Sequence, residues 1–458
     1  MLLRIKLATL LATVATLASC PPLYAQPVHA QPAAKAEQTS FTRDGLSFPA
    51  IVTSPVTPGR HPAVVLISGS GATEADNMLP EAQAFARAGI VALTYRKRTE
   101  GYSKVHRDYT QLADDALAGM TQLLKNRPDV DPARIGLLGF SEGGWVAPLA
   151  ATRSDAVKFL ITVGANGLTP ARQETWAVAN RVRWHGIQGS MGRMLHTAMR
   201  QVTEGGVFPE PFYDPVPTLA KVTVPVLAVW GGHDVLTPPG ESLEVYRDTF
   251  ARTGHRHHTL KTYPDGQHRI LGTDDRGFTK RADYQPGYLN LLGEWVNTVA
   301  FGPPVSTVDA PAKQDARALP REPLGWWEAG WLQLAVLALL LIAFLGYGIG
   351  ALRRTRSVRP ARWLAGLGSA AVLGALGYVG FLFTSNAFHV GGPIILGRPL
   401  PWLAVQLLWV ATVVAGVCTA LAWRREKATV TARFRLPLLL AGTAVLVPFG
   451  LYWGLLLP

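Results

Sequence analysis

The sequence predicts an α/β protein with a doubly wound, mostly parallel sheet, followed by an all-α transmembrane domain of four helices. Up to about residue 300, short apolar runs typical of buried parallel strands alternate with helix-like segments and charged loops. Beyond Leu324, long apolar stretches are interrupted only by clusters of arginine. The first 25 residues have the pattern of a secretory signal. The chain of 458 residues therefore combines an exported domain with a membrane domain.

The predicted signal peptide comprises residues 1–25. Arg4 and Lys6 precede an apolar run, and small residues follow that run up to Ala25. Two processing outcomes remain open. Signal peptidase would cleave after Ala25, whereas the four residues that end at Cys20 resemble a bacterial lipobox and would direct lipid attachment to that cysteine.

The exported domain is expected over residues 38–301, and a hairpin that turns at Asp44 and Gly45 opens it. The following core strands are predicted at 63–67, 90–95, 134–138, 159–163, 226–230 and 259–263, with helices at 79–88, 109–124, 144–150, 241–250 and 287–299. An insertion, residues 165–222, separates two of these strands. Residues 302–323 are rich in Pro and Ala, which predicts a linker to the membrane domain.

The membrane domain is expected over residues 324–458. Its four apolar stretches lie at about 329–352, 363–383, 402–423 and 436–457, and each is long enough to cross a bilayer at ~1.5 Å of rise per residue. Trp402 and Trp423 would lie about 31 Å apart along one helix. We therefore expect both rings at headgroup level, on opposite sides of the membrane.

Arginine placement predicts the orientation of these helices. The first and third inter-helix loops are rich in basic residues, whereas the loop over 384–401 holds only Arg398. Basic loops stay in the cytoplasm, so the exported domain is expected at the outer face of the cytoplasmic membrane. Of the net charge of +13, the signal contributes +2 and residues 324–458 contribute +9, which leaves +2 for the exported domain. Such a small charge argues against nucleic acid as a partner.

One short motif carries the chemistry of the exported domain. Gly139-Phe140-Ser141-Glu142-Gly143 follows an apolar strand directly and precedes a predicted helix. Small residues on both sides let the turn tighten until the serine oxygen stands clear of the backbone. The helix that follows directs its first amides towards any negative charge that forms there. Ser141 is therefore the candidate nucleophile.

With this motif, the chain resembles the exported esterases and peptidase-like hydrolases of the α/β-hydrolase superfamily, over about residues 38–301. Their first core loop reads Gly-Ser-Gly, as at residues 69–71 here, and their nucleophile motif ends in Gly-Gly. The resemblance implies a nucleophile, an acid and a histidine in that order along the chain. These roles fall on Ser141, Asp234 and His268. Asp265 is an alternative acid, and the alternative histidines are His233, His255, His257 and His258, although residues 256–258 look like a solvated stretch.

The three residue types are needed together because a serine hydroxyl is a weak nucleophile unless an imidazole removes its proton. A carboxylate then fixes the imidazole tautomer and stabilises its charged form. Negative charge on the attacked carbonyl oxygen needs amide donors, which are expected at Ser70 and Glu142. Many relatives have a histidine where this chain has Ser68.

Substrate selection is expected to reside in the insertion at 165–222. Its Trp and Met residues predict helices with a partly apolar face, which either form a lid over the serine or pack onto the core. His106 and the basic run at 96–98 either meet an acidic substrate group or form solvated surface.

The leading hypothesis is an exported, membrane-anchored serine hydrolase that cleaves carboxylic esters. A serine peptidase or amidase would use the same three residues, and a catalytically silent binding or sensory module is the alternative outside enzymes. The histidines and cysteines lack metal-ligand spacing, so we expect no metal and no cofactor. The expected partners are a small ester or peptide-like substrate and the lipid bilayer. The sequence does not indicate a protein partner for the membrane domain.

Overall fold

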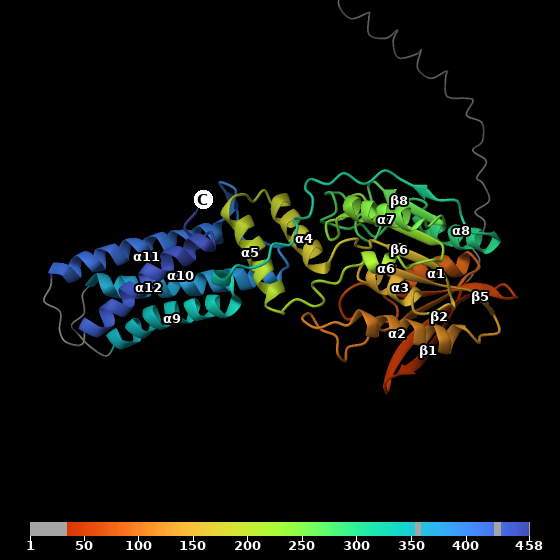
Figure 1. Cartoon of the computed structure of the whole chain (residues 1–458), viewed down its shortest axis with the longest axis horizontal. Coiled ribbons are helices and arrows are strands. Elements are labelled where there is room, and N and C mark those ends of the chain that lie inside the picture. The colour runs from red at the N-terminus through yellow and green to blue at the C-terminus, as the bar shows by residue number, and fades with distance from the viewer. Residues whose placement is uncertain (1–33, 353–358, 426–431, 458) are drawn as a thin grey trace, which may run out of the picture. The chain divides into compact units, whose positions relative to one another are not determined.

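The computed structural model describes residues 34–352, 359–425 and 432–457. The predicted signal peptide, Cys20 and the loop arginines Arg353, Arg354 and Arg356 lie outside these residues. Within them, a nine-stranded sheet has the order β1-β2-β4-β3-β5-β6-β7-β8-β9 (Figure 1). The predicted α/β class and the doubly wound, mostly parallel sheet are confirmed.

The strands follow the predicted apolar runs. Their bounds are β1 (Ala34–Arg43), β2 (Leu46–Pro55), β3 (His61–Ile67), β4 (Val91–Tyr95), β5 (Val130–Phe140), β6 (Val157–Val163), β7 (Val226–Gly231), β8 (His258–Tyr263) and β9 (Thr307–Val308). β1 and β2 pair antiparallel around Asp44 and Gly45, and β2 pairs antiparallel with β4. From β4 through β9 every neighbouring pair is parallel. The carboxyl ends of these parallel strands therefore meet at one edge, where ligands bind in such sheets.

Helices cover both faces of the sheet, and each layer buries a separate apolar core. One face packs against α2 (Tyr109–Gly119), α3 (Gly143–Ala151), α6 (Val216–Leu219) and α7 (Pro239–Thr253). The opposite face packs against α1 (Leu79–Arg87) and α8 (Tyr288–Phe301). The predicted helix at 109–124 changes at its end into a π-helical turn, η1 (Met120–Leu124).

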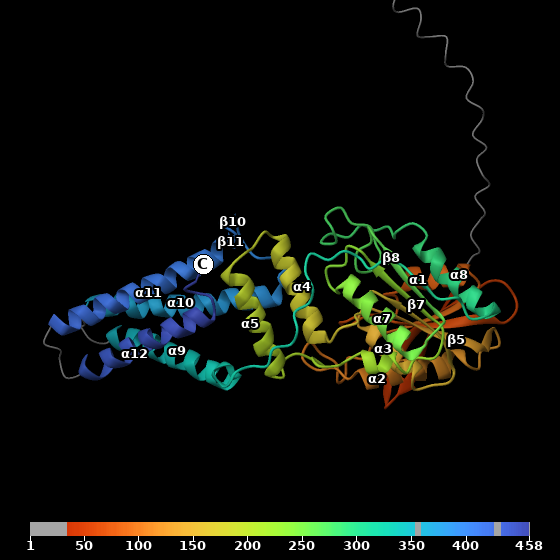
Figure 2. The ribbon, with the colours of Figure 1, turned by 45° about the horizontal axis from the view of Figure 1, so that its top comes forward.

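Four long helices make up the membrane domain, as predicted. They are α9 (Gly330–Leu352), α10 (Arg359–Thr384), α11 (Leu400–Arg425) and α12 (Ala432–Tyr452), and each is long and apolar enough to cross a membrane. Figure 2 shows them running alongside one another, and α10 and α12 each pack against both α9 and α11. A 3-10 turn, η2 (Trp326–Glu328), precedes α9, and two short strands, β10 (Ile394–Ile395) and β11 (Arg398–Pro399), join α10 to α11.

The Trp402 side chain packs inside the bundle. It is fully buried in the apolar core, where its ring lies 6.1 Å from that of Tyr378. Trp402 is the third residue of α11, and Tyr378 of α10 lies against it, so its ring does not face lipid. Its predicted headgroup level stays a prediction. Trp326, Trp327 and Trp363 are exposed, as an interfacial position requires.

The predicted insertion forms two long helices, α4 (Pro170–Trp184) and α5 (Ser190–Glu204), and the short α6, which packs on the sheet. The apolar face of α5 shares one continuous core with the four membrane helices, through Met191, Met194 and Leu195. We call the end of the bundle at which α9 and α11 start and α10 and α12 finish the cap end, because α5 covers it. The insertion therefore packs mainly onto the membrane domain, rather than onto the sheet.

Polar contacts fix α5 on the cap end. Arg200 forms an ion pair with Glu328, at 3.0 Å, and Gln201 donates to the Tyr452 hydroxyl. The buried Gln406 of α11 donates to the Ser190 hydroxyl, 3.2 Å away, and to the carbonyl oxygens of Gly454 and Leu457. A buried polar side chain is stabilised only when its hydrogen bonds are made, so these contacts specify how α5 sits.

The predicted linker, residues 302–323, is partly structured. Thr307 and Val308 form β9 and pair with Thr259 and Leu260 at the edge of the sheet. Further along, the carbonyl oxygen of Ala316 accepts a hydrogen bond from the Trp176 indole at 2.8 Å. The segment is therefore tied to both β8 and α4, because its backbone groups find partners that a free tether would leave to water.

Two histidines at the start of β8 are packed against the core, contrary to the solvated stretch predicted there. His258 is 8% exposed, and the rings of His255 and His258 lie 4.7 and 5.1 Å from that of Phe250. Burial lowers the pKa of both side chains below the ordinary value of histidine. Each therefore favours its neutral form in the folded chain.

We expect acid to destabilise the folded chain through these histidines. As pH falls through about 6.5, the unfolded chain binds protons that the folded chain resists, so the free energy of unfolding decreases. Above that pH both forms are neutral and the stability is retained. Thermal unfolding at pH 7.5 and 5.5 should therefore show a smaller acid-induced fall in Tm for His255→Asn/His258→Asn than for the exposed-site control His106→Asn. Equal falls in both variants would contradict the assignment.

Candidate active site

Ser141 lies at a sharp turn between β5 and α3. Its φ angle is +55°, a left-handed conformation that a residue with a side chain rarely adopts. The Ser141 amide donates to the carbonyl oxygen of Val163 at 2.9 Å, and the Gly144 amide donates to Ser141 at 2.8 Å. These bonds hold the strained turn, which is the geometry expected of a nucleophile elbow.

The glycines around Ser141 are required by close backbone approach. A Cβ added to Gly139 would lie 2.0 Å from the carbonyl oxygen of Gly143. A Cβ on Gly143 would lie 2.4 Å from the carbonyl oxygen of Ile67, at the end of β3. The absence of side chains at both positions therefore brings α3 close enough to β3 and β5 to form the turn.

A chain of hydrogen bonds joins the three residues that the sequence singled out. The Nε2 atom of His268 lies 2.8 Å from Ser141 Oγ, and its Nδ1 atom lies 2.7 Å from Asp234 Oδ2. The three residues follow the carboxyl ends of β5, β7 and β8, at one edge of the sheet. Asp234 and His268 are only 4% and 7% exposed, so water screens their contact poorly.

Asp234 is held by three further donors. Its Oδ1 atom accepts from the amides of Leu236 and Thr237, at 2.8 and 2.9 Å. The Thr237 hydroxyl donates to Oδ2 at 2.5 Å, beside the contact from His268. These bonds satisfy a carboxylate taken out of water and fix its orientation towards the imidazole.

An ion pair next to His268 fixes the loop that carries it. Arg269 donates from Nε and Nη2 to the two carboxylate oxygens of Glu81 in α1, each at 2.8 Å. The Tyr284 hydroxyl also donates to Glu81, whose side chain is 1% exposed. Gly164 lies directly beneath the histidine, since a Cβ there would come within 3.1 Å of His268 Nδ1. The imidazole position is thus set from both sides.

The loop after β3 reaches Ser141 from the other side. A Cβ on Gly69 would lie 3.1 Å from that of Ser141, so the backbone preceding Ser70 borders the serine. The ammonium of Lys97 donates to the carbonyl oxygen of Gly69 and, at 2.8 Å, to the carboxylate of Glu142. The Tyr102 hydroxyl accepts from the Gly71 amide and donates to Glu142, at 2.8 and 2.9 Å.

Glu142 therefore joins the two backbone segments that were predicted to supply amide donors. Its side chain is 1% exposed, and Arg107 lies 2.6 Å from its second oxygen. Burial lowers the pKa of Lys97, although the neighbouring Glu142 opposes that effect. Because Lys97 is itself 4% exposed, its pairing with Glu142 is a buried ion pair, and loss of Glu142 would leave Lys97 with an uncompensated charge.

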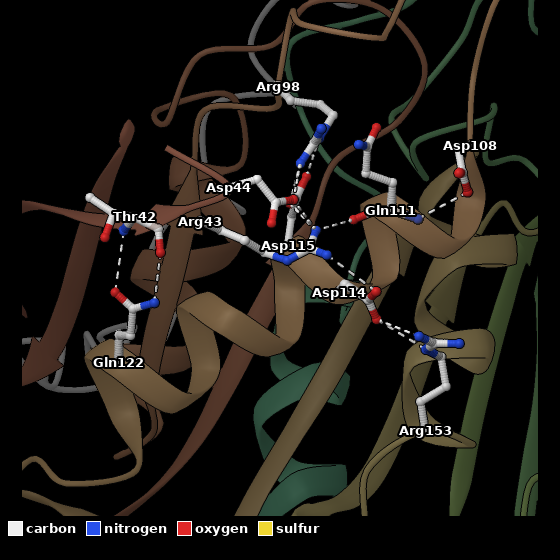
Figure 3. Close-up of polar contacts among 10 residues, drawn as sticks. All are labelled: Thr42, Arg43, Asp44, Arg98, Asp108, Gln111, Asp114, Asp115, Gln122 and Arg153. Carbon is white, nitrogen blue, oxygen red and sulfur yellow. Dashed lines mark hydrogen bonds and ion pairs between the residues drawn. The ribbon is translucent and has the colours of Figure 1, made fainter. Parts of the chain in front are cut away.

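In the basic run at 96–98, Lys97 and Arg98 are buried and ion-paired, so they are neither solvated surface nor available to an acidic substrate, whereas Arg96 is exposed. Figure 3 shows Arg98 beside Asp115 of α2, to which it donates two hydrogen bonds at 2.6 and 2.7 Å. Arg43 from the β1–β2 turn contacts the same carboxylate at 2.8 Å. Asp114, the neighbour of Asp115, pairs with Arg153 beyond α3. These pairs fix the segment that carries Lys97.

Three of the alternative histidines lie away from Ser141, whereas His233 directly precedes Asp234. His255, His257 and His258 lie where β8 begins, at the sheet edge opposite to Ser141. Asp265 is exposed, whereas Asp234 occupies the partner position on His268. Sequence reasoning missed Lys97 and Tyr102. Their place in the sequence could have indicated them, because both follow the carboxyl end of β4, at the sheet edge where Ser141 lies.

Comparisons with known proteins show similarity to hydrolases. Residues 99–285 match the model of the prolyl oligopeptidase family. The chain is 28% identical over 227 residues to the esterase EstD of Thermotoga maritima, a match that covers 43% of this chain and 52% of that protein. It is 27% identical to the 2,6-dihydropseudooxynicotine hydrolase of Paenarthrobacter nicotinovorans, over 32% of this chain and 42% of that protein. The chain thus spans about half the length of the curated relatives it matches.

Among solved structures, the chain is similar to that of a 2,6-dihydroxy-pseudo-oxynicotine hydrolase. The match has a TM-score of 0.42 and 19% identity, and it covers 60% of this chain and 71% of the other.

Proposed function

We propose that the chain is a serine hydrolase of the α/β-hydrolase superfamily that cleaves carboxylic esters at the outer face of the cytoplasmic membrane. The observation that supports this proposal most directly is the hydrogen-bonded series from Asp234 through His268 to a serine at positive φ. A structural serine in an ordinary turn has no need of a buried imidazole and carboxylate in line with its hydroxyl. This arrangement also makes a catalytically silent module the weaker alternative.

In the proposed reaction, Ser141 Oγ attacks the ester carbonyl carbon while His268 Nε2 takes the serine proton. Asp234 holds the Nδ1 proton of the imidazole and stabilises the imidazolium. The tetrahedral intermediate collapses as His268 gives the proton to the departing alkoxide, which leaves as an alcohol and an acyl-enzyme. Water, deprotonated by the same imidazole, attacks the acyl-enzyme and releases the carboxylic acid, and Ser141 regains its proton.

Negative charge on the carbonyl oxygen requires fixed donors, which we assign to the amides of Ser70 and Glu142. No acceptor among the described residues is bonded to either amide, so both are available for an oxyanion. Lys97 and Tyr102 act as positioning residues, because they tie the Ser70 loop to the Glu142 side chain. The donors are therefore preorganised before substrate binds.

A serine peptidase is the second candidate, since the matched family model is that of the prolyl oligopeptidases. The purified full chain should be assayed with short-chain and long-chain p-nitrophenyl esters and with aminoacyl p-nitroanilides. We expect kcat/KM to be higher for an ester than for the best anilide, because an alkoxide or phenoxide departs more readily than an amine. A higher kcat/KM for an anilide would instead show that the chain is a peptidase.

A further inference from the structure

A groove between α4 and α5 lies apart from the catalytic residues. Its cavity volume is about 540 Å³, within the range of small-molecule sites, and the segment Ala316–Leu319 closes one side. Neither Ser141 nor Asp234 nor His268 lines it. We call it the α4–α5 groove.

The walls of the α4–α5 groove are largely apolar. Val178 and Val182 come from α4, and Leu195 and Met199 come from α5. All four are buried and belong to the same hydrophobic core as the membrane helices, together with Phe344, Trp402 and Trp409. The groove therefore continues the apolar interior of the cap end, which is an environment suited to a hydrocarbon chain.

The charged side chains that line the groove are basic. Arg183, Arg193 and Arg317 line it, and no acidic side chain is among its described lining residues. Arg317 forms ion pairs with Glu241 and Glu244 of α7, whereas Arg183 is exposed on the last turn of α4. His196 also lines the groove, but burial and the charge of Arg200 lower its pKa, so Arg183 rather than His196 is an exposed cation of the border near neutral pH. Such a border attracts an anionic group.

The position of the groove indicates where its occupant comes from. Leu319, which lines the groove, is exposed and lies only a few residues before Trp326 and Trp327. These exposed indoles precede α9, and Trp331 in its first turn is exposed as well. Exposed tryptophans at the ends of membrane helices mark the headgroup region of a bilayer. The α4–α5 groove therefore adjoins the membrane surface.

We propose that the α4–α5 groove binds one phospholipid with an anionic headgroup, whose acyl chain lies against the apolar walls and whose phosphate faces Arg183. The apolar walls suit an acyl chain, and the basic border suits an anionic headgroup. A phospholipid of the adjoining membrane carries both groups. The bound lipid would fill the space between two helices that otherwise meet incompletely. This site is separate from the proposed catalysis and does not depend on it.

The test is native mass spectrometry of the full chain, purified in detergent as the Ser141→Ala variant so that no ester is hydrolysed. Dioleoyl phosphatidylglycerol, dioleoyl phosphatidylcholine and oleate are titrated separately. We expect one phosphatidylglycerol to be retained with a Kd at least tenfold lower than that of phosphatidylcholine. Arg183→Glu should weaken phosphatidylglycerol binding by about tenfold, because it replaces attraction by repulsion. The control Arg247→Glu, an exposed arginine on α7, should leave binding unchanged.

A second variant tests the apolar part of the site. Val182→Trp narrows the α4–α5 groove and should reduce retention of phosphatidylglycerol, and its Tm in the same detergent reports whether the chain still folds. Equal binding of phosphatidylglycerol and phosphatidylcholine, preferential binding of oleate, or an equal loss in Arg183→Glu and Arg247→Glu would each overturn the proposal. The Arg183→Glu arm decides the outcome if Val182→Trp does not fold, because Arg183 is exposed.

Discussion

Ser141→Ala should abolish covalent labelling by a fluorophosphonate probe and lower kcat for ester hydrolysis by roughly 10⁴- to 10⁶-fold. The probe reacts with a serine only when a base removes its proton, and His268 Nε2 lies 2.8 Å from Ser141 Oγ. Labelling is read on a gel and hydrolysis by release of p-nitrophenol. Because the methyl group of alanine fits the same turn, we expect the fold to be retained, which circular dichroism and Tm will show.

Two further variants make this result specific. His268→Gln should lose labelling as completely as Ser141→Ala, because the base is gone. Ser47→Ala removes an exposed hydroxyl on β2 and should label like the wild type. Labelling that persists in Ser141→Ala would show that another residue is the nucleophile and would refute the proposed mechanism.

Lys97→Met should lower kcat by roughly 10²- to 10³-fold, comparable to the loss of one oxyanion donor. The ammonium of Lys97 is the shared partner of Gly69, which precedes the Ser70 amide, and of Glu142, whose own amide is the second proposed donor. Without it the Ser70 loop keeps only the Tyr102 link to Glu142, so stabilisation of the transition state should fall more than substrate binding does. We therefore expect a fall in kcat with little change in KM, measured with a p-nitrophenyl ester.

Because Lys97→Met leaves the buried Glu142 with Arg107 as its one remaining cation among the described residues, the Tm of this variant must be measured alongside. Tyr102→Phe avoids that problem, since it removes the hydrogen bonds to Gly71 and Glu142 without altering charge, and should lower kcat by about tenfold. Lys104→Met, on an exposed position of the same loop, is the matched control and should behave like the wild type. If kcat is unchanged in both Lys97→Met and Tyr102→Phe, neither residue positions the proposed oxyanion donors.

The positions of the three candidate catalytic residues were predictable because each follows an apolar strand. Parallel strands place their carboxyl ends at one edge, so Ser141, Asp234 and His268 had to be neighbours once the strands before them were identified. The sequence could not reveal Lys97 in the same way. A lysine between two arginines is typical of a solvated loop, and only the buried carboxylate of Glu142, 45 residues later, explains its position.

The membrane domain was predictable in composition and less so in packing. Length and hydropathy sufficed for four spanning helices. An amphipathic helix such as α5 shows in its sequence that one face needs a partner, but not which partner, and here it is the cap end of the bundle. The packing of that core also explains the burial of the Trp402 ring, which does not face lipid.

The attachment of α5 to the cap end has a practical consequence for anyone who wishes to crystallise the catalytic part alone. A truncation at Pro323 follows the composition of the chain, yet it would strip away the surface on which Met191, Met194 and Leu195 rest. The fragment would expose the apolar face of α5 to solvent, and we expect it to self-associate through that face. A soluble fragment would need polar substitutions at these apolar positions of α5.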